Sequence, residues 1–390
     1  MISVEEALSH VFDLLSPVGV ETVPLAEAAG RVLAAPVRAK RTQPPFPASA
    51  MDGYALNGTE AEPHAMFKVI GTAAAGHGFG GRVGPGQAVR IFTGAPVPEG
   101  ATRVIIQEDV TARGDMITLG DALDSGPHIR PAGNDFAEGA TVEPPRRLTP
   151  ADLSLLAAMN IPELPVRRRP VVAIIATGDE LVMPGEEPGP DQIIASNSFG
   201  LKALVEAEGA EARLLPIARD TRASLETVFG LAEGADLILT SGGASVGEHD
   251  LVGDVAAGLG MEQSFYKVAM RPGKPLMAGR MGDAAMIGLP GNPVSALVCG
   301  HVFVRPALRA MLGLGAAPAP RHKGALAAPI GANGPREHYM RATITPGGLS
   351  VFDRQDSALL SVLAAADALV IRPPHDGPRG AGEAVEYLTL

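Results

Sequence analysis

The spacing of apolar residues changes along the chain and divides it into regions. Apolar positions recur at helical intervals from Val4 to Leu15, behind a Ser3–Glu6 capping-box pattern, which predicts an amphipathic N-terminal helix. Between residues 67 and 142, short alternating runs are separated by glycine and proline turns, a pattern typical of a small all-β module. Alternation resumes from Arg321 and predicts a second β module.

Residues 171–312 instead alternate strand-like and helix-like runs. The run Leu237-Ile238-Leu239 is apolar without alternation, which is typical of a strand buried on both faces of a parallel sheet. This region predicts a doubly wound mixed α/β domain. We expect strands at 171–176, 211–217, 236–240, 262–268, 275–279 and 284–289, and helices at 199–208, 222–232, 251–259 and 294–312.

The predicted fold class is α/β multidomain: a doubly wound mixed α/β domain, two small β modules and a discontinuous helical N-terminal subdomain. Thr149 and Pro150 predict the start of a helix, which we expect to pack back on the N-terminal helices. The arginines of 167–170 indicate a boundary at a solvated linker. The predicted divisions are 1–41 with 140–169 (linker and dimerisation), 42–139 (β module), 170–314 (α/β domain) and 320–390 (C-terminal β module).

Composition narrows the class of protein. The 390 residues are 46% hydrophobic, which indicates a globular chain, and the net charge of −11 argues against broad binding to nucleic acid or to a membrane surface. We find no apolar run of membrane-spanning length. The single cysteine, Cys299, excludes an intramolecular disulfide framework and a cysteine-rich zinc site. An N-terminus without a basic leader favours a cytoplasmic protein.

Polar chemistry is concentrated where the expected central strand ends. This strand is followed by Ser241-Gly242-Gly243, and then by Ser245 and Asp250 before the next helix. Glycines let backbone N–H groups approach a ligand, and ligands bind at the carboxyl ends of strands in open α/β sheets. A glycine-rich turn with solvated polar residues explains the segment about equally well, because it matches neither the dinucleotide fingerprint nor the P-loop.

Acidic residues follow three of the expected strands, at Glu180, Asp220 and Asp250. If the strands are parallel, these carboxylates share one rim of the sheet and suit Mg²⁺ bound together with a phosphate. Asp220 and Asp250 also stand where a helix N-cap is expected, and one residue can serve both purposes.

Three cations stand close together in this acidic chain: Lys267, Arg271 and Lys274. Alternation along the expected strand places Lys267 and Arg271 on one face, and such donors aimed at one point would bind an oxyanion. An exposed edge strand protected by lysines is the alternative. Further on, Asn292 and Pro293 begin a helix whose N-terminus either binds an anion or is simply well capped.

Six short motifs occur in order along nearly the whole chain. They are Ser49–Ala55, Thr93–Pro98, Thr177–Leu181, Ser241–Gly247, Arg271–Pro275 and Gly288–Ser295. Together they resemble the molybdopterin molybdenumtransferase family, which includes the E domain of gephyrin.

The resemblance implies a reaction and an assembly. Members of this family insert molybdate into adenylated molybdopterin, hydrolyse the adenylate, release AMP and require Mg²⁺. They form elongated homodimers of four subdomains, with the cleft between the α/β domain of one subunit and the N-terminal part of the other. Neither nucleic acid nor a membrane is an expected partner. Many members have lysine at the position of Arg271, which here offers a planar fork instead of a point charge.

The residues and the resemblance together give a predicted site. The predicted catalytic residues are Asp52, Thr93, Asp135, Glu180, Asp250, Lys267 and Arg271. The predicted substrate-binding residues are Ser241, Gly242, Gly243, Ser245, Lys274, Pro290, Asn292, Pro293, Arg341 and Ser357. The predicted metal ligands are Glu180, Asp220 and Asp250.

Two other functions stay open at this point. Molybdopterin adenylyltransferases share the α/β domain, although they usually consist of that domain alone. A non-catalytic scaffold that holds the pterin or clusters a membrane receptor would bind tightly without turnover, but the chain lacks gephyrin's other domain and long linker.

Overall fold

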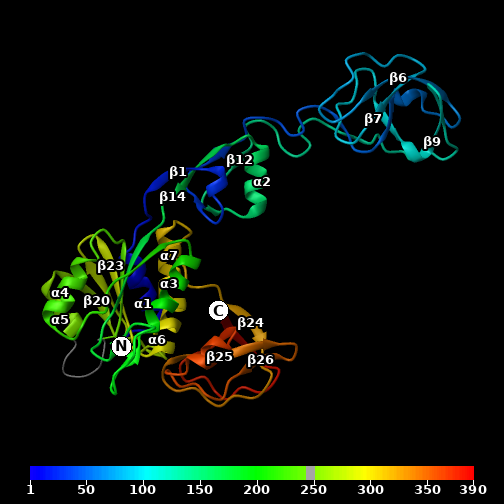
Figure 1. The fold of residues 1–390 in the computed structure, drawn as a ribbon. Coiled ribbons are helices and arrows are strands. Elements are labelled where there is room, and N and C mark those ends of the chain that lie inside the picture. Colours follow the sequence, from blue (N-terminus) through cyan, green and yellow to red (C-terminus); the bar gives the residue numbers. More distant parts are fainter. Residues whose placement is uncertain (243–250) are drawn as a thin grey trace.

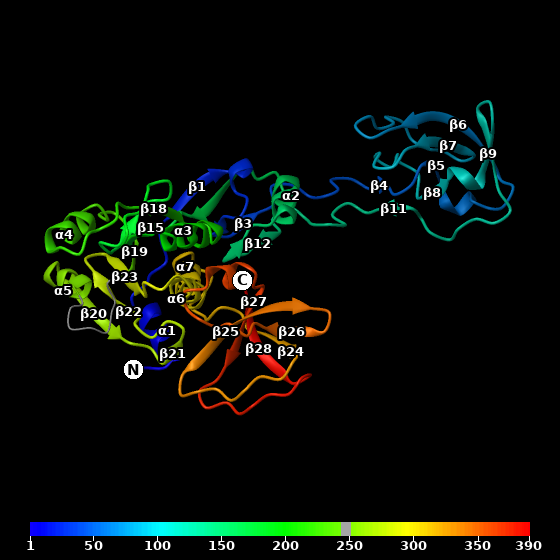
Figure 2. The ribbon, with the colours of Figure 1, turned by 60° about the horizontal axis from the view of Figure 1, so that its bottom comes forward.

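The computed structural model describes residues 1–242 and 251–390. The molecule is elongated (Figures 1 and 2). An α/β domain and the C-terminal β module lie side by side, a small sheet extends from them, and a second β module lies farthest out. Two chain segments connect this outer module to the small sheet, because the chain runs out through it and returns. The predicted α/β multidomain class is confirmed.

The α/β domain is built on a six-stranded mixed sheet, as predicted. In spatial order its strands are β18 (Glu211–Leu214), β15 (Val171–Ala176), β19 (Leu237–Ser241), β23 (Ala284–Leu289), β22 (Met277–Met281) and β20 (Met261–Tyr266). The first four are parallel, whereas β22 and β20 run antiparallel to their neighbours. Every residue of β19 and β23 is buried, because both faces of the sheet are covered.

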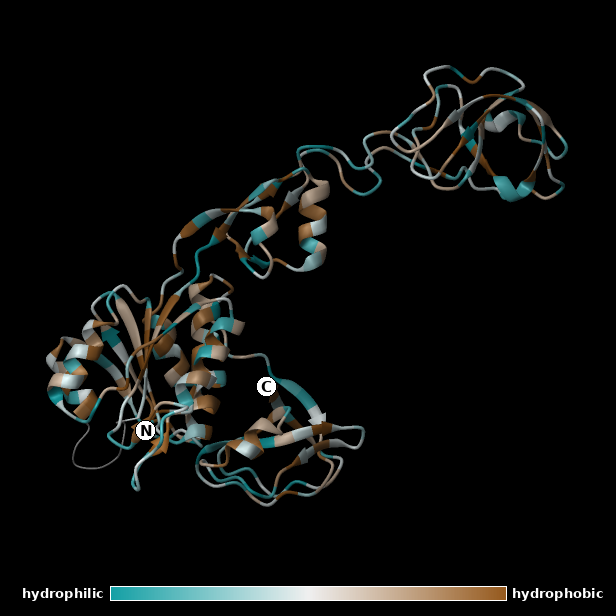
Figure 3. Cartoon of the chain, viewed as in Figure 1, coloured by the Kyte–Doolittle hydropathy of each residue, from teal (hydrophilic) through white to brown (hydrophobic). Residues whose placement is uncertain are grey.

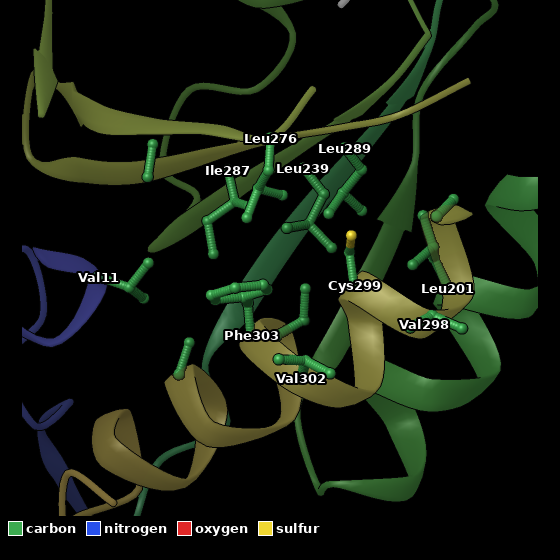
Figure 4. Packing of buried hydrophobic residues seen from close by; sticks show 14 of the residues in the cluster. Val11, Leu201, Leu239, Leu276, Ile287, Leu289, Val298, Cys299, Val302 and Phe303 are labelled. Carbon is green, nitrogen blue, oxygen red and sulfur yellow. The ribbon is translucent and has the colours of Figure 1, made fainter. Parts of the chain in front are cut away.

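Helices cover the two faces of this sheet in separate layers. Val172 and Ile174 of β15 face a cluster that contains Leu201 and Phe303, whereas Ala173 and Ile175 face a cluster with Val228 and Val255. Figure 4 shows the first cluster around Phe303. The helices are α3 (Asn197–Ala207), α4 (Arg222–Gly230), α5 (Leu251–Gly258), α6 (Pro293–Cys299) and α7 (Arg305–Met311).

A π-helical turn, Gly300–Val304, joins α6 to α7. Pro306 follows it, and proline lacks an N–H and crowds the carbonyl four residues back, which accounts for the wider turn. The combined helix, Pro293–Met311, is 19 residues long and apolar enough to cross a membrane by length and composition, although it contains His301, Arg305 and Arg309. It is 72% buried within the protein, like the core helix of a globular domain, and Figure 3 shows hydrophobic residues gathered on it and on the neighbouring strands.

The N-terminal helix α1 (Val4–Asp13) packs on the α/β domain. The predicted capping box of Ser3 and Glu6 is present, and the buried face of the helix, which includes Leu8 and Val11, joins the same cluster as Phe303. The division that placed all of residues 1–41 with residues 140–169 is therefore wrong for this helix. Its apolar stripe finds a larger apolar surface against the sheet than the small subdomain offers.

The small subdomain is discontinuous, but it is a sheet with one helix and not a helical unit as expected. Its strands, in order, are β1 (Val20–Pro24), β14 (Glu163–Arg167), β2 (Val32–Leu33) and β13 (Arg146–Arg147). The helix α2 (Pro150–Ala158) begins at the predicted N-cap, Thr149, and buries Leu156 against this sheet. At the boundary, Arg168 is not simply solvated, because its guanidinium pairs with both carboxylate oxygens of Asp236 at 2.7 and 2.5 Å.

The outer module and the C-terminal module are both β-rich, as predicted. The short pairs β3 (Val37–Arg38) with β12 (Thr141–Val142) and β4 (Ala48–Ser49) with β11 (Ile129–Arg130) line the path to the outer module. The outer sheet, in order, is β8 (Arg103–Ile106), β5 (Gly53–Leu56), β7 (Gln87–Ile91), β6 (Met66–Ala73), β10 (Met116–Leu119) and β9 (Val110–Arg113). The C-terminal sheet, in order, is β21 (Met270–Arg271), β25 (Glu337–Thr345), β27 (Ala368–Arg372), β28 (Ala384–Thr389) and β24 (His322–Ala325), with β26 (Gly348–Val351) beside β25 and the helix α8 (Leu360–Ala364) nearby.

Candidate active cleft

A cavity of about 670 Å³ lies at the carboxyl ends of β15, β19 and β23. This is the edge of an open α/β sheet where ligands bind. Five of the predicted substrate-binding residues line it: Ser241, Gly242, Pro290, Asn292 and Pro293. The predicted Glu180 also lines this cavity.

Asn197, which the sequence analysis did not single out, lines this first cavity. Its side-chain amide donates to Ser241 Oγ at 2.9 Å and to the Gly291 carbonyl at 2.8 Å, and so ties two strand ends together. Gly242 has a φ of +110°, and a Cβ built on it would lie 2.4 Å from the Thr177 carbonyl oxygen. Only glycine fits there without moving the backbone.

Two of the three predicted metal ligands lie on neighbouring loops. Gly178 N donates to the Ala218 carbonyl at 3.1 Å, and Asp220 N donates to Asp179 Oδ1 at 3.1 Å, so the loops of Glu180 and Asp220 are joined. The N-cap of α4 is Thr221, so Asp220 is not the cap residue. Residues 1–242 and 251–390 contain no group of three potential ligands close enough to hold a metal.

Three predicted residues, Gly243, Ser245 and Asp250, lie outside the described residues. The glycine-loop and metal predictions that depend on them stay predictions.

A second cavity of about 300 Å³ lies between the α/β domain and the C-terminal module. Pro275 and Asn292 line both cavities, so the two are parts of one cleft. The predicted Arg271, Lys274 and Ser357 line the second cavity. Asn292 does not cap α6 with its side chain but donates to Ser357 Oγ at 3.1 Å, and this bond links the two domains.

Arg271 belongs to the C-terminal sheet. The strand β21 pairs in parallel with β25, so that Arg271 stands opposite His338. The turn that follows requires Gly273, whose φ is +111° and whose added Cβ would meet Cys299 Sγ at 2.5 Å. This turn brings Lys274 to the same cavity as Arg271.

Lys267 differs from the prediction. Strand β20 ends at Tyr266, and Lys267 has a φ of +71°, so it does not alternate along a strand with Arg271. Its ammonium lies 4.7 Å from the centre of the Tyr266 ring, and Lys267 lines neither part of the cleft. The backbone turns here because Ile2 forms a β-bridge with Val268 and interrupts the expected strand.

Arg341 is fully buried and lies beside Asp356, which lines the second cavity. Its Nη2 donates to the Asp356 carbonyl at 3.0 Å, whereas Nε and Nη1 have no hydrogen-bond partner in the described part of the chain. Burial lowers the pKa of Arg341; Asp356 opposes this shift and Arg271 adds to it. Burial likewise lowers the pKa of His338 to about 4, with Arg271 contributing, so this imidazole is neutral at pH 7.

The remaining predicted residues lie on the outer arm of the molecule. Asp52 Oδ1 accepts from both the backbone N–H and the hydroxyl of Thr93 at 2.7 Å, and these bonds lower the pKa of Asp52. Asp135 lines a separate cavity of about 430 Å³ with Arg41 and Arg130. Figure 1 shows the outer module apart from the α/β domain, so one chain does not bring these residues to its own cleft.

Three family models together match most of the chain. "MoeA N-terminal region (domain I and II)" matches residues 2–160, "Probable molybdopterin binding domain" matches 173–310, and "MoeA C-terminal region (domain IV)" matches 323–390. The middle model covers the α/β domain that carries the first cavity. The fold and the cleft therefore define a multidomain molybdopterin-binding protein of the MoeA class.

Relatives of known name narrow this class. The molybdopterin molybdenumtransferase 2 of Mycobacterium tuberculosis is 37% identical over 389 residues, which is 96% of this chain and 96% of the relative. The molybdopterin molybdenumtransferase of Haemophilus influenzae is 38% identical and covers 84% of this chain and 82% of its own. The structure of the molybdopterin biosynthesis MoeA protein from Pyrococcus horikoshii OT3 is 28% identical, covers 100% of both chains and has a TM-score of 0.87. The chain belongs to the molybdopterin molybdenumtransferase family.

Proposed function

We propose that this protein is a cytoplasmic molybdopterin molybdenumtransferase. It inserts molybdate into adenylated molybdopterin, hydrolyses the adenylate and releases AMP. The observation that carries the proposal is a pair of adjoining cavities, one at the sheet edge and one lined by cations, which share the lining residues Pro275 and Asn292.

The first cavity binds the adenylated pterin. It is lined by Ser241 and Gly242 after β19 and by Pro290, Asn292 and Pro293 after β23. The backbone of Gly242 is held close to Thr177, which favours a fixed floor over an adaptable one. A fixed floor holds the substrate in a reactive orientation before the second reactant arrives.

The second cavity binds molybdate. Both reactants are anions and repel each other, so positive charge must be concentrated where they meet. Arg271 and Lys274 line this cavity, and buried Arg341, whose Nε and Nη1 have no partner among the described residues, donates from Nη2 to the carbonyl of the lining residue Asp356. An oxyanion that reaches these donors satisfies a buried charge, and this supplies a driving force for its binding.

The donor set at the cleft edge fits Mg²⁺, which the family implies. Glu180 and Asp220 offer hard oxygen ligands from adjacent loops, and Asp250 is the third proposed ligand. Mg²⁺, when bound, would offset negative charge on the adenylate phosphate. Of these three carboxylates, that of Glu180 belongs to a residue that lines the first cavity.

The proposed protein is a homodimer whose partner completes each cleft. Asp52, Thr93 and Asp135 lie on the outer arm, away from the cleft of their own chain. Co-expression of Asp52→Ala with Lys274→Ala tests this arrangement. Each variant alone is expected to be inactive. The co-expressed mixture should recover about a quarter of wild-type AMP release, because about half of all dimers are mixed and each mixed dimer has one intact cleft out of two. If the mixture stays inactive, the two residues do not act across a subunit interface.

The reaction itself is tested with purified protein, adenylated molybdopterin and molybdate. AMP release that depends on molybdate supports the proposal. AMP incorporation from ATP into molybdopterin would instead indicate an adenylyltransferase, and tight binding without turnover would indicate a scaffold.

A further inference from the structure

The turn that carries Glu180 is held by the guanidinium of Arg219. This turn, Gly178–Leu181, follows β15 at the edge of the first cavity. Arg219 Nη1 donates to three carbonyls of the turn, those of Asp179 (3.1 Å), Leu181 (3.1 Å) and Gly178 (3.5 Å). The remaining carbonyl, that of Glu180, accepts from the N–H of Ile193 at 2.7 Å. All four carbonyls of the turn therefore have partners, and three of them share one nitrogen.

Arg219 is itself fixed in the loop that follows β18. Its backbone N–H donates to the hydroxyl of Ser224, in the first turn of α4, at 2.9 Å. One residue earlier, Ala218 forms a parallel β-bridge with Thr177, and this bridge sets the two loops side by side. The contacts of one side chain therefore fix the loops of two proposed metal ligands relative to each other.

The bonds of Arg219 go to carbonyl oxygens and leave the nearby carboxylates unpaired. Within residues 1–242 and 251–390, neither Glu180 nor Asp220 forms a salt bridge. A Cβ added to Gly178 would collide with the carboxylate of Glu180, so this carboxylate lies against the turn that Arg219 holds. A shift of the turn therefore moves the carboxylate as well.

We infer that Arg219 is a positioning residue that acts through Glu180: it holds the turn Gly178–Leu181 in the shape that presents the Glu180 carboxylate to the first cavity. Arg219 is not among the residues that line either cavity, so its effect on a ligand there is indirect. The inference rests on the proposed function for the nature of that ligand, a divalent cation. Groups that orient a metal-binding carboxylate typically raise metal affinity about 10–100-fold.

The charge of Arg219 acts in the opposite direction. A cation close to the carboxylates repels a second cation, so removing the charge alone would strengthen metal binding. Positioning and repulsion thus predict changes of opposite sign when Arg219 is replaced, and the sign distinguishes them.

The binding test uses Mn²⁺ as the probe, with the full chain and without substrate. For Arg219→Gln we expect the dissociation constant of Mn²⁺, measured by equilibrium dialysis, to rise about tenfold. Arg219→Lys should fall between wild type and Arg219→Gln, because it keeps the charge and loses the planar donor set. Arg222→Gln is the matched control and should change nothing, since Arg222 lies in the first turn of α4 and pairs only at the surface, with Glu226 at 3.5 Å.

Kinetics and unfolding complete the test. In Arg219→Gln the Mg²⁺ concentration at half-maximal AMP release should rise about tenfold, while the rate at saturating Mg²⁺ stays within about threefold of wild type. A variant that unfolds at lower temperature but keeps its metal dependence would give Arg219 a purely structural role and overturn the inference, as would tighter binding of Mn²⁺.

The wild type separates this inference from the proposed function. A wild type that binds Mn²⁺ but releases no AMP would contradict the proposed function alone, and the dissociation constants would still decide the role of Arg219. A wild type that neither binds Mn²⁺ nor depends on Mg²⁺ for AMP release would overturn the inference together with the proposed metal site.

Discussion

Replacing Arg341 with methionine distinguishes the effect of its buried charge on the stability of the fold from its effect on activity. Methionine has a similar length, carries no charge and adapts to the space left by the guanidinium. The side chain of Arg341 is fully buried, and two of its nitrogens have no partner in the described part of the chain. The substitution therefore removes an unsatisfied charged group and also removes the bonds from Nη2 to the carbonyls of Asp356 and Arg354.

The magnitude follows from these contacts. Two buried donors without partners cost the free protein about 2–6 kcal/mol in total. The bond to Asp356, at 3.0 Å, offsets about 1.5–3 kcal/mol, and the one to Arg354 is long at 3.4 Å and offsets less. We therefore expect Arg341→Met to leave the free energy of unfolding unchanged or to raise it by up to about 3 kcal/mol. AMP release should fall about a hundredfold or more, since the oxyanion loses preorganised donors.

The assay is urea unfolding followed by circular dichroism, together with molybdate-dependent AMP release. Arg372→Met is the matched control, because Arg372 is equally buried but its donors reach Asp376 and the carbonyls of Gly331 and Gly377. That variant should lose about 3–5 kcal/mol, since it removes three charge-assisted hydrogen bonds, although Asp376 keeps Arg379 as a partner. If Arg341→Met is destabilised as much as Arg372→Met, Arg341 supports the fold and the reasoning is refuted.

Three further predictions follow from single contacts. Gly242→Ala should lose substrate affinity and destabilise the protein by about 2 kcal/mol or more, because it combines a positive φ with a clash against Thr177. Gly234→Ala, with a φ of +75° and no atom near its Cβ, should show the backbone cost alone. Equal losses of stability in urea unfolding would contradict this reasoning. Burial lowers the pKa of His338 to about 4, so between pH 7 and pH 5 the unfolded chain binds a proton that the folded state does not. The free energy of unfolding should therefore fall by about 2 kcal/mol over this range. His338→Gln should remove that part of the loss. Burial raises the pKa of Asp236, but the bonds from Arg168 outweigh it and lower the pKa overall. Asp236→Asn should therefore cost about 1 kcal/mol of stability at pH 7, and this difference from wild type should vanish as the pH falls through the lowered pKa. A difference that persists at pH 2 would mean that the charge is not responsible.

Much of the fold could be predicted from the apolar pattern. The unbroken apolar run of β19 predicted a strand that is buried on both faces, and the capping residues Ser3 and Thr149 locate the starts of two helices. The partner of the first helix could not be predicted, because an amphipathic face specifies burial but not the surface that buries it. The helix α1 therefore went to the wrong domain, although its own bounds were expected.

The site was predictable where residues follow strand ends in sequence, and less so where contacts depend on tertiary pairing. Glu180, Ser241 and Asn292 meet at one cavity because parallel strands end together. Lys267 was expected beside Arg271, but a bridge between Ile2 and Val268 turns the backbone there. Arg336, which also lines the second cavity, carries no motif, and it reaches that cavity only because β21 pairs with β25, a contact between distant segments.

This pairing also places cations from two domains at the second cavity. Arg271 belongs by hydrogen bonding to the C-terminal sheet, whereas Lys274, three residues later, leads into the α/β domain. The contacts from Asn292 and Val294 to Ser357 add a second link between the same domains, at 3.1 and 3.0 Å. Under the proposed function, an oxyanion bound between these links would share its charge with cations from both domains. Its binding energy can thus be used to align the second cavity with the first, which is the alignment that the proposed transfer requires.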